Sequence, residues 1–279
     1  MGGVSRGAEL PAKITTMQAH FDIYEEIVRL RKLGEPAALC TVMLSRGSTP
    51  GKETMKMLVR GDGSTVGSVG GGCVEEDVRQ MALEVIAHDR SETKSFRLNQ
   101  VDVPESGLIC GGQVTILAEP VVPPLLVLLG AGHVAAAAAR VAKECDLRVW
   151  VCDNREEYAN AAEHPAADEV IAGEWSEIVE KVGLAQHHYL VIVTRGHKDD
   201  EEVLWQIHEG GCRPKYLGMI GSRAKKAQLD NILRDRGVSD EWLASIQTPI
   251  GLDIGAKSSG EIAVSLVSQL VKLRRNGIL

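Results

Sequence analysis

The first part of the chain mixes helical and strand-like patterns of apolar residues. Between residues 20 and 33 the apolar positions lie three and four apart, which predicts a helix, and Gly34 suits the residue that ends it. A second amphipathic helix is predicted over residues 74–86. Apolar runs predict strands over residues 37–44, 94–98 and 113–120, and a hairpin over residues 54–69. These elements predict an α+β domain over residues 20–120, preceded by a flexible leader over residues 1–19.

The pattern changes after the proline-rich segment EPVVPP, residues 119–124. From there, short and fully apolar strands alternate with helices. Such alternation predicts a parallel sheet with helices on both faces, and hence an α/β, Rossmann-like domain over residues 124–279. The predicted strands are residues 125–130, 147–153, 167–172, 189–194 and 216–221, and the predicted helices are residues 133–145, 174–183, 199–211, 222–237 and 261–275.

The overall composition narrows the class of ligand. The 279 residues carry a net charge of −7, and the isoelectric point is near 5.7. An acidic chain is poorly matched to polyanionic surfaces, and aromatic residues that could stack on bases make up only 4%. We therefore expect neither nucleic acid nor a membrane as partner. Proline and glycine also break the longest apolar run before it could span a bilayer.

Six cysteines are scattered along the chain without a C-x-x-C pair. Because the N-terminus also lacks an apolar signal region, this pattern predicts reduced thiols and a cytoplasmic protein. Four of the six lie in or beside apolar elements and are expected to serve packing: Cys40, Cys145, Cys152 and Cys212.

The first strand of the second domain leads into a glycine-rich turn. Gly130, Gly132 and Ala135 fit the pattern G-x-G-x-x-A, and Asp153 ends the following strand. In nucleotide-binding folds such glycines let the backbone approach a phosphate, and the acid reads ribose hydroxyls. The pattern favours a site for NAD(P), although the same turn can serve helix–sheet packing alone. His133, inside the turn, either faces this site or bonds the local backbone.

Two further loops follow strands of the same sheet. Their residues are expected at its carboxyl edge, where open α/β sheets bind ligands. Arg195 and His197 follow one strand, and the planar guanidinium of Arg195 could clamp a phosphate. Gly221, Ser222 and Arg223 open a helix after another strand. That position suits an anion, although Ser222 also has the chemistry of a simple helix cap.

Acidic residues near this edge have two possible roles. Asp199, Asp200 and Glu201 are expected to complement the dipole of the helix that they open rather than to bind a metal. Asp253 lies in a glycine-rich loop before the last helix. Its carboxylate either bonds a ligand hydroxyl or makes an Asx-turn.

In the first domain, the stretch SVGGGCVEE places three glycines directly before a cysteine. Gly70, Gly71 and Gly72 predict a tight turn or a close approach to a ligand, and Cys73 then begins a helix. A helix N-terminus stabilises a thiolate, whereas the two glutamates that follow oppose it. The alternative is that Cys73 is a small, buried packing residue.

A second cysteine of the first domain has similar neighbours. Cys110 precedes Gly111 and Gly112, just before a predicted strand. Two cysteines beside glycine turns in one domain predict a shared pocket.

Several stretches together resemble the xanthine dehydrogenase accessory proteins of the XdhC/CoxI type. The likeness runs in order from about residue 20 to the C-terminus, and GSVGGGC and GLDIGA are its most specific segments. One departure is Gly51, where the family pattern leads us to expect a basic residue. The other stretches that carry it are residues 47–78, ICGGQV, LGAGHVA, VTRGHKDDEEVL, YLGMIGSRAKK and PIGLDIGAKSSGEIAVSLVSQLV.

The resemblance implies a homodimeric, two-domain protein that binds the molybdenum cofactor, molybdopterin. It would protect the cofactor, support the exchange of an oxo for a sulfido ligand with a separate cysteine desulfurase, and deliver the product to an apo-molybdenum hydroxylase of the xanthine dehydrogenase type. On this reading, Cys73 and Cys110 are the candidate catalytic residues. The glycines at 70–72, 111 and 112, and the turn at 130–133, belong to the cofactor site.

These implications agree with elementary chemistry. A phosphate suits a glycine turn, and a site that handles sulfur needs an accessible thiolate. We therefore expect the glycine turns of both domains to meet in one cleft, where an anionic pterin lies within reach of sulfur. The alternatives are an NAD(P)-dependent oxidoreductase, with the first domain as a lid, and a regulatory module that senses a nucleotide. No clear hydride-transfer constellation supports the first alternative.

Overall fold

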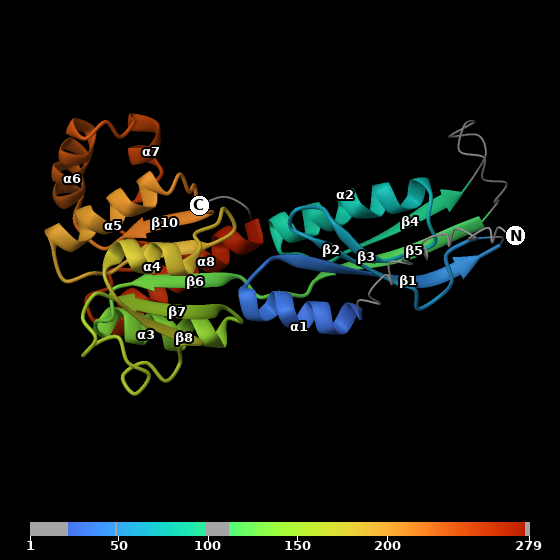
Figure 1. The fold of residues 1–279 in the computed structure, drawn as a ribbon, viewed down its shortest axis with the longest axis horizontal. Coiled ribbons are helices and arrows are strands. Elements are labelled where there is room, and N and C mark those ends of the chain that lie inside the picture. The colour runs from blue at the N-terminus through green and yellow to red at the C-terminus, as the bar shows by residue number, and fades with distance from the viewer. Residues whose placement is uncertain (1–21, 48, 99–111, 277–279) are drawn as a thin grey trace, which may run out of the picture.

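A computed structural model describes residues 22–47, 49–98 and 112–276 of the chain. The elements form two units that lie end to end along the long axis of the molecule, each built on its own sheet (Figure 1). Within the described residues, the N-terminal unit contains one sheet and two helices. The C-terminal unit, here called the Rossmann domain, contains a parallel sheet covered by helices.

The N-terminal sheet is antiparallel in every pair of neighbouring strands, in the order β3-β2-β1-β5-β4. One helix, α2, packs its apolar residues on one face of the sheet, and α1 covers part of the other face. The elements are α1 (Ile23–Leu33), β1 (Ala37–Arg46), β2 (Lys56–Arg60), β3 (Thr65–Gly67), α2 (Cys73–His88), β4 (Glu92–Leu98) and β5 (Gly112–Pro120).

Local chemistry fixes both ends of α1 and its place on the sheet. The Asp22 carboxylate caps its first turn by accepting from the amide of Tyr24 at 2.7 Å, and Gly34 ends it at φ +80°, as predicted. Glu26 is almost fully buried, and it accepts from Arg29 and from Arg60 of β2, each at 2.7 Å. Hydrogen bonds from Arg29 and Arg60 outweigh burial and lower the pKa of Glu26 to about 2.

The Rossmann sheet has the order β11-β10-β9-β6-β7-β8, and all its paired strands are parallel. Alternate residues of β6 feed two cores: one lies under α4, α5, α6 and α7, and the other lies under α3 and α8. The elements are β6 (Leu125–Leu129), α3 (His133–Glu144), β7 (Arg148–Asp153), β8 (Glu169–Ala172), α4 (Trp175–Val182), β9 (Tyr189–Ile192), α5 (His197–Glu209), β10 (Tyr216–Met219), α6 (Arg223–Asp235), α7 (Asp240–Ala244), β11 (Ile246–Gln247) and α8 (Ser259–Asn276).

The predicted fold class is confirmed. Each predicted helix and strand overlaps one in the structure, including the hairpin β2–β3. The sequence patterns missed α7 and β11, which have five and two residues. Elements this short carry too few apolar positions to reveal a period.

The two units meet where α2 ends. The Lys215 ammonium of the Rossmann domain donates to the carbonyl of Ala87 at 2.7 Å, and Arg274 of α8 pairs with Asp89. The guanidinium of Arg275 also donates to the backbone carbonyl of Asp89, at 3.2 Å. The C-terminal end of α2 is therefore anchored on the Rossmann domain, and its N-terminal end points away.

This anchoring overturns the expected common cleft within one chain. Helix α2 has 16 residues, so Cys73 lies about 24 Å from the junction. Strand β6 starts at the junction and runs about 16 Å in the opposite direction before the turn at Gly130. The glycine turns of the two units thus lie at opposite ends of the molecule (Figure 1).

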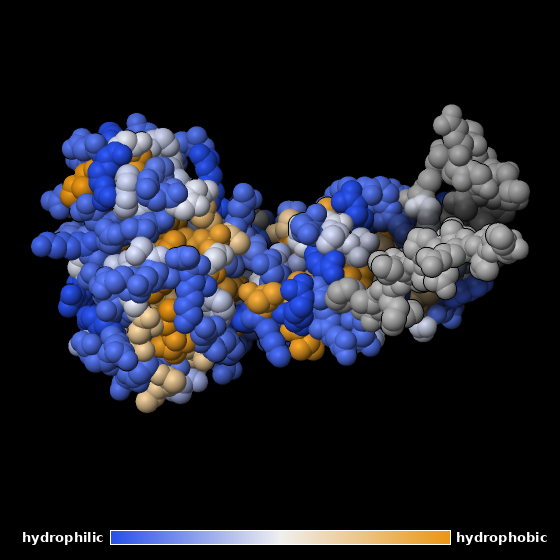
Figure 2. Space-filling view, viewed as in Figure 1, coloured by the Kyte–Doolittle hydropathy of each residue, from blue (hydrophilic) through white to orange (hydrophobic). Residues whose placement is uncertain are grey.

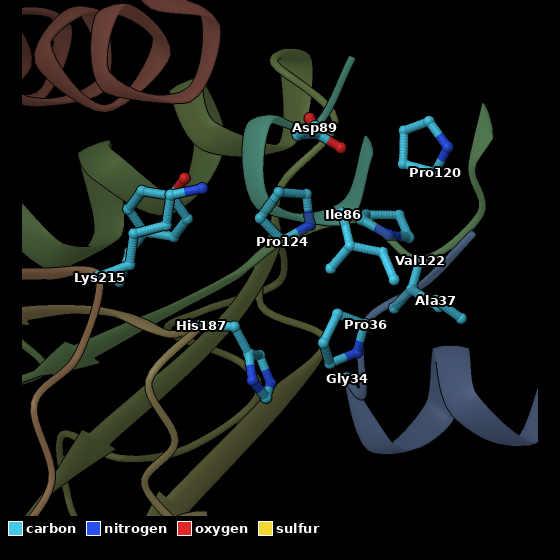
Figure 3. Close-up of a pocket in the computed structure, with 12 residues that line it drawn as sticks. Gly34, Pro36, Ala37, Ile86, Asp89, Pro120, Val122, Pro124, His187 and Lys215 are labelled. Carbon is cyan, nitrogen blue, oxygen red and sulfur yellow. The ribbon is translucent and has the colours of Figure 1, made fainter. Parts of the chain in front are cut away.

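A small cavity lies at the junction itself (Figure 3). It measures about 40 Å³ and is walled by Pro36 and Pro124, with His187 and Lys215 on its Rossmann side. Tyr189 also lines it, and burial raises the pKa of Tyr189 to about 12. This volume suits a few waters and not a pterin, so the junction is a packed joint between the units.

The visible surface of the Rossmann domain is largely hydrophilic, with smaller apolar patches (Figure 2). Within the described ranges, no helix has the length and hydrophobicity needed to cross a bilayer.

Candidate functional site

The carboxyl edge of the Rossmann sheet gathers most of the predicted site residues. Strands β6, β7, β9 and β10 all end there, because parallel strands present their carboxyl ends on one side. The predicted residues lie at the last position of such a strand, in the loops that follow, at the first position of the next helix, or in the loop before α8: Gly130, Gly132, His133, Asp153, Arg195, His197, Gly221, Ser222, Arg223 and Asp253.

The two glycines of the turn after β6 have different tasks. Gly130 has φ +122°, and a Cβ at this position would lie 2.4 Å from the carbonyl oxygen of Val193. It is therefore required for the close approach of the turn to the end of β9. Gly132 caps α3, and a Cβ there would meet no described atom within 4 Å. The helix N-terminus above Gly132 faces open space, where its free amides can receive an anion.

A cleft of about 580 Å³ lies in front of this turn, and we call it the turn cleft. Gly132 and His133 line it, together with Thr194 and Arg195 from the loop after β9. The Arg195 guanidinium bonds Asp199 at 3.1 Å, and the side chain is 62% exposed, which leaves most of its donors free. His197 is exposed at the start of α5, in the same loop region.

A second cleft of about 700 Å³, here called the loop cleft, adjoins the first at Ile220. Gly221, Arg223 and Asp253 line it. Ser222 is the N-cap of α6, since its hydroxyl accepts from the amide of Lys225 at 3.1 Å. The alternative role foreseen for Ser222 is therefore confirmed.

Three buried or half-buried residues hold the two clefts together: Asp200, for which we expected only a role at the helix dipole, and Thr194 and Lys225, to which the sequence analysis assigned no role. The Asp200 carboxylate is fully buried, accepts from the Thr194 hydroxyl at 2.7 Å and pairs with the Lys225 ammonium. Lys225 also donates to the carbonyl of Ile220 at 3.2 Å. This network ties the first turn of α5 to that of α6 and so fixes the loops of both clefts. Only the fold brings its members together, since they are spread over 32 positions.

The Asp153 carboxylate is not free to bind ribose hydroxyls, as an acid at this position of a nucleotide-binding fold would be. It is 1% exposed and accepts from the amide of Ala131 at 2.7 Å and from the Arg155 guanidinium at 2.8 and 2.9 Å. Burial raises the pKa of Asp153, but these hydrogen bonds outweigh it, and the net pKa is lowered. The carboxylate holds the glycine turn in shape, and a ribose could reach it only by displacing Arg155.

The glycine–cysteine turn before α2 is filled by the chain itself. The Glu75 carboxylate accepts from the amide of Gly71 at 2.9 Å, from the amide of Val69 at 3.2 Å and from the Ser68 hydroxyl at 2.5 Å. The anion that these amides hold is thus a side chain three residues past Gly72. The sequence contains this glutamate, but its reach back over the turn depends on the path of the loop.

Close packing explains another glycine of this turn. A Cβ on Gly70 would lie 2.5 Å from the amide nitrogen of Gly51, and a Cβ on Gly51 would lie 2.4 Å from the carbonyl oxygen of Val69. The departure from the expected basic residue at position 51 therefore has a steric cause: the two loops touch through their backbones.

The remaining predicted residues of this unit are described in part. Gly72 caps α2 at φ +71°, and Cys73 begins the helix, but its side chain lies outside the described part of the structure. Gly112 begins β5 at the same end of the sheet, opposite Leu98. Cys110 and Gly111 also lie outside the described residues, so the shared pocket stays a prediction.

The other thiols behave largely as expected. Cys40, Cys152 and Cys212 are buried, and burial raises the pKa of each. For Cys40 the value is about 12. Cys145 is only half-buried. In the part of the chain that the structure describes, no three His, Cys, Asp or Glu side chains cluster as metal ligands would.

Comparison with known families matches both units. The model for the XdhC and CoxI family matches residues 30–97, and that for the XdhC Rossmann domain matches residues 126–270. The protein therefore belongs to the XdhC/CoxI family, a family associated with the maturation of xanthine dehydrogenase.

Two curated proteins are similar to this chain. The uncharacterized protein YqeB of Escherichia coli is 31% identical over 91% of this chain and 47% of its own length. A Bacillus subtilis protein described as a probable xanthine dehydrogenase subunit is 27% identical over 54% of this chain and 43% of its own. The chain thus spans about half the length of these curated relatives.

A solved structure also aligns with most of the chain. It is a crystal structure described as a xanthine dehydrogenase from Bacillus halodurans, with 22% identity and a TM-score of 0.48. The alignment covers 90% of this chain and 96% of that one.

Proposed function

We propose that this protein binds the molybdenum cofactor, molybdopterin, at the carboxyl edge of its Rossmann sheet. There it protects the cofactor, supports its sulfuration together with a cysteine desulfurase, and delivers it to an apo-molybdenum hydroxylase of the xanthine dehydrogenase type. The observation that carries the proposal is the open N-terminus of α3 above Gly132, with the guanidinium of Arg195 beside it.

The residues present fit the phosphate of such a cargo. Free amides at the start of α3, a largely free guanidinium and two adjoining clefts of about 580 and 700 Å³ give room for an anionic ring system. The bound cargo supplies the molybdenum centre at which an oxo ligand is exchanged for a sulfido ligand. The protein's part is to hold the phosphate, orient the pterin and limit the access of water.

Cys73 lies in the other unit, at the opposite end of the molecule from the turn before α3. One cofactor can touch both ends only if two chains lie head to tail, and the homodimer implied by the family resemblance would supply that arrangement. Co-expressed Cys73→Ser and Gly132→Asp chains should then activate a client enzyme when neither chain does so alone. Failure of the mixture to activate the client would contradict a site shared between two chains.

The direct test is cofactor analysis after co-expression with the molybdopterin pathway. Purified protein should contain pterin, measured by the fluorescence of the oxidised pterin after release. Protein that returns no pterin, and that does not slow the oxidation of added molybdopterin, would contradict the proposal.

The alternative of an NAD(P)-dependent oxidoreductase rests on the same turn. Its support is weakened by Asp153, whose carboxylate is already bonded to Arg155 and to the backbone. Measurement of NADH absorbance with small carbonyl substrates separates the two functions. Turnover of NADH without pterin binding would favour the oxidoreductase.

A further inference from the structure

The loop cleft differs in chemistry from the turn cleft beside it. Among the described residues that line it, Arg223 and Asp253 carry the charges, whereas the turn cleft is lined by several charges of both signs. Most of the remaining wall is apolar and includes Ile220, Pro249, Ile250, Leu252, Ile254 and Ile262. A pocket of this kind binds a ring by its faces and orients the ring through a few polar groups.

Both charged groups of the loop cleft are free. Asp253 and Arg223 are exposed, and among the described residues neither side chain has a hydrogen-bond or ion-pair partner. The nearby Glu261 is used differently, because its carboxylate accepts from the amides of Lys257 and Ser258 at 2.8 Å and so caps α8. The Asx-turn considered for Asp253 is thus not formed in the described structure. Its carboxylate is available to a ligand.

The backbone just before Asp253 is tied to α8. The amide of Gly251 donates to the carboxamide oxygen of Gln269 at 2.7 Å, and the amide of Leu252 donates to the carbonyl of Ser265 at 3.2 Å. The Ser265 hydroxyl donates in turn to the carbonyl of Leu252 at 2.5 Å. Ser265 and Gln269 are themselves buried. The position of Asp253 is therefore set by the core of the domain, as a residue that determines specificity requires.

We infer that the loop cleft receives the ring of a pterin, and that the Asp253 carboxylate binds the 2-amino-4-oxopyrimidine edge of this ring. That edge presents two adjacent N–H donors, one from the 2-amino group and one from the ring nitrogen beside it. The two oxygens of a carboxylate accept from such a pair in a bidentate arrangement. Arg223 supplies donors for the 4-oxo group, and the apolar wall covers the faces of the ring.

This inference deepens the proposed function and rests on it for the choice of a pterin. It assigns the ring to the loop cleft, next to the turn cleft to which the phosphate is assigned. The two clefts adjoin at Ile220, so one ligand can occupy both.

Fluorescence titration of the full chain with 6-hydroxymethylpterin and with 6-hydroxymethyllumazine tests the assignment. Lumazine carries a carbonyl acceptor in place of the 2-amino donor, and this acceptor would face the Asp253 carboxylate. The parent protein should therefore bind the pterin about 10- to 100-fold more tightly, as expected for one bidentate pair. No binding of the pterin, or equal affinities for the two ligands, would overturn the inference.

Guanine carries the same donor edge, so guanosine is the third ligand. Its ribose projects close to the amino edge, whereas the side chain of the pterin is attached at the far end of the ring. Guanosine should therefore bind more weakly than 6-hydroxymethylpterin. Equal or tighter binding of guanosine would overturn the assignment of a pterin to this cleft.

Asp253→Asn tests the carboxylate directly. The new amide keeps one acceptor but places a donor against a donor of the pterin, while it matches the edge of lumazine. The variant should bind the pterin at least about 10-fold more weakly and lose the preference for pterin over lumazine. The matched control is Asp235→Asn, at an exposed position at the end of α6, and it should change neither affinity.

Arg223→Gln tests the opposite contact. Because both ligands carry the 4-oxo group, this variant should weaken the binding of pterin and lumazine alike. Unchanged affinities for both ligands would overturn the placement of the ring between Arg223 and Asp253.

Thermal unfolding separates binding from folding in Asp253→Asn. Because the carboxylate has no partner among the described residues, the variant should unfold at the temperature of the parent protein. A marked fall in stability would make Asp253 a structural residue and overturn the inference, as would a full preference for pterin in the folded variant. The proposed function fails on a different result, the absence of pterin from co-expressed protein. A protein that retains pterin after co-expression but does not distinguish pterin from lumazine would refute the ring assignment alone.

Discussion

The two glycine turns of this protein are built alike and used differently. Each opens a helix, and each contains one glycine pressed against a neighbouring backbone: Gly70 against Gly51, and Gly130 against Val193. Each also contains a glycine with open space around it, Gly71 in one turn and Gly132 in the other. The turn before α2 is closed by the chain's own Glu75, whereas the turn before α3 opens onto a cleft.

A glycine turn at a helix N-terminus therefore indicates an anion site. It does not indicate whether the anion is a side chain of the protein or a bound ligand. The amides before α2 are satisfied within the chain. That turn is therefore set in shape before any ligand arrives. At the turn before α3, no described side chain caps the helix, so its first backbone amides are available to bind a phosphate.

The largest effect should come from the glycine that touches β9. Gly130→Ala places a Cβ 2.4 Å from the Val193 carbonyl oxygen at a φ of +122°. We expect it to reduce the free energy of unfolding by about 4 kcal/mol, or to prevent folding. Gly132→Ala, at an ordinary φ and in open space, should cost less than about 1 kcal/mol. Urea unfolding of the two variants makes the comparison, and equal stabilities would contradict the division of tasks between these glycines.

Removal of the internal anion should have a medium effect. Glu75→Ala leaves the amides of Val69 and Gly71 without their acceptor, and we expect a loss of about 2 kcal/mol. Sulfate should then restore part of the stability, since the turn becomes an anion site like that of α3. The matched control is Glu76→Ala, whose carboxylate is exposed and bonds only to its own helix. Identical melting of the two variants with and without sulfate would show that Glu75 does not fill the turn.

The smallest effect concerns the carboxylate that anchors α1. The pKa of Glu26 is lowered from its ordinary value of 4.5 to about 2. A group with a lowered pKa stabilises the fold above the pKa of the unfolded chain and loses that contribution as the pH falls through the folded value. Glu26→Gln removes the charge but keeps an acceptor for the two arginines, so it should cost about 1 kcal/mol at pH 7. The difference from the parent protein should shrink as the pH falls from 4.5 toward 2. A difference that is constant over this range would contradict the ion pairs of Glu26 as its source.

Much of this architecture could be predicted because it depends on local patterns. Apolar runs such as the one that forms β6 reveal buried strands, and strand–turn–helix order places Gly132, Arg195 and Arg223 at one edge of a parallel sheet. These inferences need only periodicity and the handedness of the fold. The grouping of these residues at the carboxyl edge of the sheet could therefore be predicted from the sequence.

The unpredicted features all depend on contacts between distant segments. The ion pairs of Arg155 with Asp153 and of Lys225 with Asp200 depend on the folded conformation of the loops. The separation of the two glycine turns follows from the contact of Arg274 with Asp89, 185 residues apart. No local pattern encodes such a contact, so the expectation of one shared cleft was reasonable from the sequence and wrong for the single chain.

The most direct test of this account converts the open turn into a closed one. Gly132→Asp places a carboxylate at an N-cap position with extended backbone, where aspartate is well tolerated. The fold should keep or slightly raise its stability, while the new carboxylate repels the phosphate that we assign to this site. After co-expression with the molybdopterin pathway, the variant should contain less than about one tenth of the pterin found in the parent protein, as expected for an anion displaced from its donors. A folded Gly132→Asp protein with a full complement of pterin would show that the cofactor is not held at the carboxyl edge of the Rossmann sheet.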